Sequence, residues 1–189
     1  MYGGGAPTLY ENLKENRESP IDLGEQHYLD TYKAKDGVEV AQIYIDKYFK
    51  TYEGVAKFIR AQKRNGHKLG YVKTLIGRKR RLPDINSGDF KKVAYSERLA
   101  VNATIQGSAA DIAMNAQNKI SKDEWFKERG CFMIGQVHDE IFAEVPEKYV
   151  DEAMQRMQKI MAHPFGEKVE LNLPLRADSD KGWNYSEAK

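Results

Sequence analysis

The sequence contains a single cysteine, Cys131, in 189 residues. One cysteine excludes an internal disulfide and any zinc site built from several thiolates. No apolar run approaches the ~20 residues that a membrane-spanning helix requires. Residues 1–20 also lack the apolar stretch of a secretory signal. We therefore expect a cytoplasmic protein without a membrane partner, in which Cys131 is a buried and inert thiol.

Net charge is also small, +2, but it is unevenly distributed. Residues 57–92 contain twelve Lys or Arg and two acidic residues, so this segment carries +10 and the remainder −8. A concentrated basic stretch is typical of a nucleic-acid-binding surface, although a solvated helix face followed by a basic turn has the same composition. The 41% hydrophobic and 31% charged residues are typical of a globular protein of one domain or two packed lobes.

Hydrophobic periodicity predicts an α+β protein in which helices outnumber strands. Gly54 is expected to separate two helices, Gly66 to end the second of them, and Trp183 to serve as a packing anchor. The expected elements are helices over residues 6–16, 26–35, 38–66, 94–122 and 147–161, hairpins over residues 70–82 and 131–145, and a strand over residues 169–177.

The hairpin predicted over residues 131–145 is the part of the chain most suited to chemistry. Two short runs rich in β-branched and aromatic residues flank His138, Asp139 and Glu140, which places this trio at or beside the turn. Mg²⁺ is commonly held by one or two carboxylates together with substrate phosphates, so such a turn supplies half of a phosphoryl-transfer site. A solvated polar turn has the same composition, and the trio alone does not decide between the two.

The long helix predicted over residues 94–122 carries Arg98, Asn102 and Gln106 at intervals of four. This spacing aligns the three side chains along one stripe. All three can donate hydrogen bonds, and the minor groove presents acceptors on every base pair, so the stripe can hold a duplex without reading its sequence. An exposed polar helix face is the alternative. Gly107 follows directly, and its lack of a side chain permits a close approach by another segment.

Three segments in this order resemble the family A DNA polymerases of the bacterial DNA polymerase I type. Residues 96–112 are similar to the palm-helix motif of that family, residues 136–140 to its motif C, and residues 70–85 to the segment between fingers and palm. The ending Gly182-Trp183-Asn184-Tyr185 departs slightly from the usual Asn-Trp order. The resemblance covers essentially the whole chain.

The resemblance implies roles for individual residues. Asp139 would be the motif C ligand of Mg²⁺, Glu140 an auxiliary carboxylate, and His138 a contact to the primer end. Together these three form the implied catalytic group. The implied DNA-binding residues are Arg78, Arg98, Asn102, Gln106 and His138, and the implied nucleotide- and template-binding residues are Tyr2 and Gly3.

The resemblance also implies a division of the chain and its partners. Residues 1–92 would be part of the fingers, with an insertion near residues 16–38 and the basic segment 57–92. Residues 93–189 would be the C-terminal part of the palm. The partners would be primer–template DNA and a dNTP, in the cytoplasm of a bacterial or phage-infected cell.

No segment of the sequence resembles motif A, whose aspartate bridges both metal ions in this family. Asp139 and Glu140 alone are too few ligands for two ions. We therefore expect nucleotide addition to require an upstream segment or a separate chain that carries motif A, and the isolated chain to be inactive. Two other functions remain open: a non-catalytic remnant that binds duplex nucleic acid, and a metal-dependent phosphoesterase built on the His138 trio.

Overall fold

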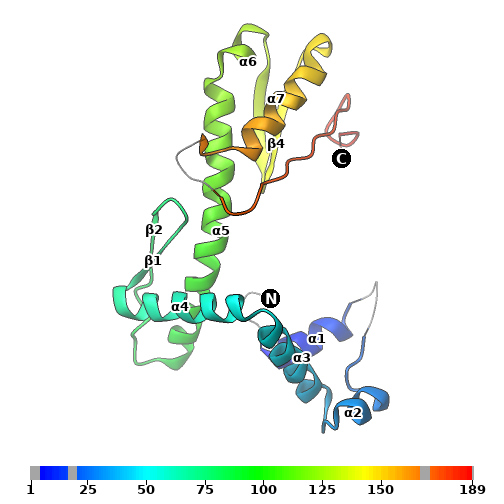
Figure 1. The fold of residues 1–189 in the computed structure, drawn as a ribbon, viewed down its shortest axis with the longest axis vertical. Helices are drawn as coiled ribbons and strands as arrows, with labels where there is room; N and C mark the ends of the chain where they lie inside the picture. The colour runs from blue at the N-terminus through cyan, green and yellow to red at the C-terminus, as the bar shows by residue number, and fades with distance from the viewer. Residues whose placement is uncertain (1–4, 17–20, 167–170, 189) are drawn as a thin grey trace. The chain divides into compact units, whose positions relative to one another are not determined.

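The computed structural model describes residues 5–16, 21–166 and 171–188. It divides into two compact units, each described separately below. The first comprises the chain up to Lys73 together with Lys79–Thr104, and the second comprises Thr74–Arg78 together with the chain from Ile105 onward. The elements are mostly α-helices with two small antiparallel sheets, β1–β2 and β3–β4, so the predicted α+β class is confirmed (Figure 1).

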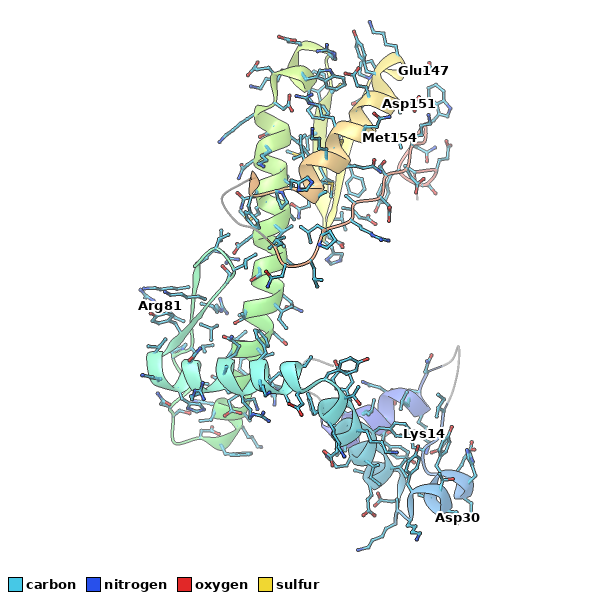
Figure 2. All side chains as sticks on the ribbon, viewed as in Figure 1. Lys14, Asp30, Arg81, Glu147, Asp151 and Met154 are labelled. Atoms are coloured by element: carbon cyan, nitrogen blue, oxygen red, sulfur yellow. The ribbon has the colours of Figure 1, made fainter. Side chains whose placement is uncertain are left out.

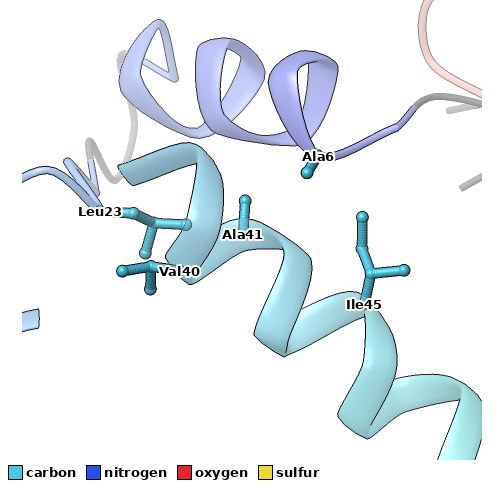
Figure 3. Close-up of a cluster of buried hydrophobic side chains, with 5 residues drawn as sticks. All are labelled: Ala6, Leu23, Val40, Ala41 and Ile45. Carbon is cyan, nitrogen blue, oxygen red and sulfur yellow. The ribbon is translucent and has the colours of Figure 1, made fainter. Parts of the chain in front are cut away.

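The first unit begins with three helices, α1 (Ala6–Lys14), α2 (Gln26–Tyr32) and α3 (Gly37–Thr51). Asp36 caps α3, because its side chain accepts a hydrogen bond from the backbone N–H of Glu39 at 2.8 Å. Apolar side chains of these segments close on one another as a separate core (Figure 3). Its buried members are Ala6, Leu23, Val40, Ala41 and Ile45.

Helix α4 (Glu53–Leu69) follows after the single residue Tyr52, so the predicted junction at Gly54 is two residues late. The predicted end at Gly66 is wrong. The helix instead ends at Gly70, whose φ of +73° is the left-handed conformation that glycine adopts without steric cost. Gly66 is buried within α4, where an added Cβ would lie 3.1 Å from Cδ1 of Leu82. Its small size therefore serves close packing.

Strands β1 (Tyr71–Lys73) and β2 (Lys79–Arg81) form the predicted basic hairpin, with Tyr71 opposite Arg81. All three β2 side chains are exposed, and Figure 2 labels Arg81 among them. The chain after β2 returns to a small core in which Leu82 and Ile85 are each 1% exposed. The buried members of this core are Val72, Leu82, Ile85 and Ala100.

Helix α5 (Phe90–Lys122) is the longest element, with 33 residues. It begins four residues before the predicted start at Ala94, because Asp89 caps it: the Asp89 carboxylate accepts the backbone N–H of Lys91 at 2.8 Å. The part of α5 from Ile105 onward belongs to the second unit.

The second unit continues with α6 (Glu124–Glu128), strands β3 (Phe132–Val137) and β4 (Glu140–Glu144), the 3₁₀ turn η1 (Glu147–Tyr149) and α7 (Val150–Ala162). The buried core of this unit consists of Ile120, Phe126, Cys131 and Ala153. Cys131 is buried, which confirms the prediction of a buried cysteine, and this burial raises the pKa of its thiol.

Two predictions for the C-terminal segment are wrong. Residues 171–177 form no strand, and the remainder of the predicted strand, residues 167–170, lies outside the described residues. No strand of the described chain pairs with this segment, and an unpaired strand has no partner for its backbone hydrogen bonds. Trp183 is 84% exposed and therefore anchors no packing here.

Among the described residues, no helix combines the length and the apolar character that a bilayer crossing requires.

Candidate functional site

The β3–β4 hairpin closes through a two-residue turn, His138 and Asp139, because Val137 and Glu140 are paired across it. His138 has φ +52°, which is uncommon for a non-glycine residue. The Gln136 side chain stabilises this turn by donating a hydrogen bond from Nε2 to the His138 carbonyl oxygen at 2.6 Å. The predicted position of the trio at the hairpin tip is confirmed.

All three side chains of the trio His138, Asp139 and Glu140 are exposed. Within the described chain, no Lys, Arg or His nitrogen lies within ion-pair distance of the Asp139 or Glu140 carboxylate. A strained turn that presents two carboxylates without a counter-charge has the features of a ligand-binding position. Carboxylate oxygens are ligands that Mg²⁺ accepts.

The trio does not form a complete metal centre by itself. Among the described residues, no group of three or more His, Cys, Asp or Glu side chains is arranged to hold a metal ion. A metal ion held by Asp139 or Glu140 would therefore need further oxygen ligands, such as substrate phosphates or waters.

The predicted stripe lies within α5, as expected. Arg98 and Gln106 are exposed. Asn102 is half-buried, and no described residue forms a hydrogen bond with its buried Oδ1 atom. Arg98 and Asn102 belong to the first unit and Gln106 to the second, so the predicted proximity of the whole stripe to Asp139 stays a prediction.

The predicted DNA-binding residue Arg78 makes contacts that the sequence did not indicate. Its Nε donates to Oδ1 of Asp111 at 2.8 Å, and its Nη2 donates to the carbonyl oxygen of Gly107 at 3.1 Å. Asp111 is 3% exposed, whereas the Arg78 side chain is 55% exposed. The sequence did not predict the contact of Asp111 with Arg78, because an acidic residue in a helix is usually solvated. The small residues around Asp111 were the only indication that it is buried.

The predicted nucleotide- and template-binding residues Tyr2 and Gly3 lie outside the described residues.

The close approach predicted at Gly107 is confirmed. An added Cβ at this position would lie 2.8 Å from Cγ2 of Thr74, which is closer than Cβ atoms approach other heavy atoms in real structures. The segment that approaches is the tip of the basic hairpin, and its Leu75 N–H donates to Oγ of Ser108 at 2.8 Å.

Comparison with known proteins gives the family of this chain. Residues 26–187 match the family described as DNA polymerase family A. The chain belongs to DNA polymerase family A. DNA polymerase I of Streptococcus pneumoniae is 40% identical over 149 residues, which cover 79% of this chain and 16% of that protein. DNA polymerase I of Bacillus caldotenax is 36% identical over 149 residues, covering 77% of this chain and 16% of the relative.

A solved family A polymerase also shares the fold. The POL domain of Pol1 from M. smegmatis, in complex with DNA primer-template and dNTP, superimposes with a TM-score of 0.79 at 29% identity. The match covers 99% of this chain and 29% of that one. The family A chain thus spans less than a third of each relative it is compared with.

The family A chain also contains a hydrogen-bonded ionic network in its first unit. Both ring nitrogens of His67 face oxygen acceptors: Nδ1 lies 2.9 Å from Asn86 Oδ1, and Nε2 lies 3.0 Å from Glu97 Oε1. Lys63 Nζ lies 2.9 Å from the other Glu97 oxygen. The hydrogen bond with Glu97, and then that with Asn86, raises the pKa of His67 above its ordinary value. The hydrogen bond from His67, and then that from Lys63, lowers the pKa of Glu97.

This network predicts a pH-dependent contribution to stability. The folded-state pKa of His67 is raised, so its contribution is fully present below the unfolded pKa near 6.5 and is lost as pH rises through the folded value. His67→Gln should therefore destabilise the protein more at about pH 6 than at about pH 8.5, by about 0.5 kcal/mol or less, because both side chains are partly exposed to solvent, which screens the pair. Urea unfolding at both pH values measures this, with His27→Gln as the control. An equal effect of His67→Gln at the two pH values would contradict the assignment.

Proposed function

We propose that this chain supplies the motif C half of a DNA polymerase active centre and catalyses template-directed nucleotide addition jointly with a segment that carries motif A. The observation that supports this most directly is the strained His138–Asp139 turn, which presents unpaired carboxylates in a chain of family A. The M. smegmatis neighbour was solved with DNA primer-template and dNTP, and we extend these partners to this chain. Such an enzyme would act in the cytoplasm of a bacterial or phage-infected cell.

In this proposal the residues of the turn contact the metal ion and the primer end. Asp139, assisted by Glu140, provides oxygen ligands for Mg²⁺, which when bound would neutralise charge on the phosphates and activate the attacking hydroxyl. His138 precedes these carboxylates in the same turn, and its exposed imidazole can donate a hydrogen bond to a phosphate or sugar oxygen of the primer end. The pairing of β3 with β4 places the backbone of the three residues at the end of the hairpin.

The proposed duplex contact is made by α5. Arg98 and Gln106 are exposed donors on the same helix, and minor-groove acceptors occur on every base pair. A polymerase must accept any sequence, so hydrogen bonds to these shared acceptors suit its task better than readout of individual bases.

The proposed need for a further segment is supported by the surface of β3. Phe132 and Ile134 on this strand are 66% and 69% exposed, and among described strands β3 pairs only with β4. The unpaired backbone groups of a strand edge can pair with another strand, and exposed apolar side chains on the sheet face are a surface that a further segment can cover. A segment placed there could also contribute the ligands that Asp139 and Glu140 lack.

Primer extension tests the proposal. The purified chain, a primer–template, Mg²⁺ and dNTPs should give no extension, and adding a polypeptide that contains motif A of a family A polymerase should restore it. The motif A polypeptide alone serves as the control. Extension by the isolated chain would contradict the proposed division of the site, and absence of rescue by any motif A polypeptide would contradict the catalytic proposal.

A non-catalytic duplex-binding role is the second candidate, favoured by the exposed basic strand β2 (Lys79–Arg81). It predicts salt-dependent duplex binding that is indifferent to Asp139→Ala, together with no rescue of extension. The phosphoesterase alternative has weaker support, because no group of three or more His, Cys, Asp or Glu side chains among the described residues is arranged to hold a metal ion.

A further inference from the structure

The tip of the basic hairpin, residues 74–78, is bound to α5 within the second unit. Three hydrogen bonds join the two segments: Leu75 N to Ser108 Oγ, Arg78 Nε to Asp111 Oδ1, and Arg78 Nη2 to the Gly107 carbonyl oxygen. These bonds hold the tip against the helix.

Asp111 is the unusual member of this contact. It is 3% exposed, and no described residue forms a hydrogen bond with its buried Oδ2 atom. Burying a carboxylate is costly, and a single ion pair with a half-exposed arginine compensates only part of that cost. A well-packed apolar residue of similar volume would serve stability as well, so stability alone does not account for a carboxylate at position 111.

We propose that Asp111 is a positioning residue that orients Arg78 for a DNA phosphate. This inference rests on the proposed function, since the ligand of Arg78 is the primer–template duplex. Asp111 and the Gly107 carbonyl engage one edge of the guanidinium, through Nε and Nη2. The remaining N–H groups lie on the other side of a planar fork whose geometry matches phosphate oxygens.

The energetic reason is pre-organisation. A free arginine side chain loses much rotamer freedom when it binds a phosphate, and this loss opposes binding. An arginine already held by a buried carboxylate has lost that freedom before DNA arrives. The negative charge of Asp111 acts in the opposite direction, because it repels the phosphate. The two effects therefore predict opposite changes in affinity when Asp111 is removed.

Gly107 gives an independent prediction. Gly107→Ala places a methyl group 2.8 Å from the buried Thr74 side chain and should displace the tip, so we expect duplex affinity to fall several-fold. Gly54→Ala is the matched control, because Gly54 is also in a helix and a Cβ added there would meet nothing within 4 Å. Binding of a fluorescent primer–template measures both, and equal affinities for the two variants would contradict the tight contact at Gly107.

The closing experiment measures primer–template binding by the full chain against salt concentration, without dNTP. The variants are Arg78→Ala, Asp111→Ala, the double substitution and Asp111→Asn, which keeps an acceptor oxygen for Nε. Asp84→Asn is the control for charge removal, since Asp84 is exposed and makes no ion pair within the described chain. Circular dichroism establishes that each variant is folded at the assay temperature.

We expect Arg78→Ala to weaken binding about tenfold and to reduce the salt slope by about 0.9, the value for one phosphate contact. Asp111→Ala should weaken binding to a similar extent with the same slope change, and the double variant should be no weaker than either. Asp111→Asn should recover part of the affinity, and Asp84→Asn should leave affinity unchanged or raise it.

Tighter or unchanged binding by Asp111→Ala, with an unaltered slope, would overturn the proposal and leave Asp111 as a fold-stabilising residue only. Additive losses in the double variant would overturn it as well. The proposed catalytic function is tested separately, because a failure of primer extension leaves these binding results intact. If Arg78→Ala alone has no effect on binding, Arg78 is not a DNA contact, while the Asp139 proposal stands.

Discussion

Asp139→Ala should abolish primer extension by this chain when it is complemented with a motif A polypeptide. Asp139 lies in the two-residue turn of the hairpin and has no protein counter-charge among the described residues. Removing it would take away several kcal/mol of charge stabilisation in the transition state. Each ~1.4 kcal/mol corresponds to tenfold in rate, so we expect a loss of about a thousandfold in single-turnover extension.

The controls for this variant come from the same hairpin. Glu144→Gln removes an exposed acid at the far end of β4 and should leave extension within about twofold of the unsubstituted chain. Duplex binding by Asp139→Ala should remain, because Asp139 contributes no positive charge. Extension within tenfold of the unsubstituted rate would remove Asp139 from the active centre.

Leu82→Ala should cause a large loss of stability in the first unit. Leu82 is 1% exposed and packs beside Ile85, Ala100 and the Cα of Gly66. Truncation removes buried methyl groups and leaves a cavity that the flanking helices cannot easily fill. Losses of about 2–5 kcal/mol are typical of such sites, and urea unfolding measures them.

Leu69→Ala makes the same chemical change at a site that is 50% exposed in the last turn of α4. Little apolar area is lost there, and alanine has the higher helix propensity, so we expect a change within about 0.5 kcal/mol. Equal effects of Leu82→Ala and Leu69→Ala would mean that the small core around Leu82 is not formed in solution.

The hairpins and the long helices were predictable because their patterns are local. Alternating and β-branched runs on both sides of His138 indicate two strands, and only a turn can join them across two residues. The sequence could not indicate that His138, and not a glycine, adopts a positive φ. That conformation is imposed by the pairing of Val137 with Glu140.

The errors arose where the outcome depends on distant partners. Gly66 reads as a helix end, yet it is a packing position that is recognised only once Leu82 is seen against it. The alternating leucines of residues 171–175 satisfy a strand pattern, but pairing requires an available edge. Asp111 has no local motif, because its role depends on Arg78, 33 residues earlier in the chain.

The central claim is that the primer end lies at the His138–Asp139 turn. A primer bearing a photoreactive nucleotide at its 3′ end, bound to the complemented protein with template and irradiated, tests this most directly. Mass spectrometry of the cross-linked peptides should locate the modification within residues 136–140. Cross-links confined to the basic segment 57–92, with none at the turn, would contradict the claim and favour a chain that only binds duplex DNA.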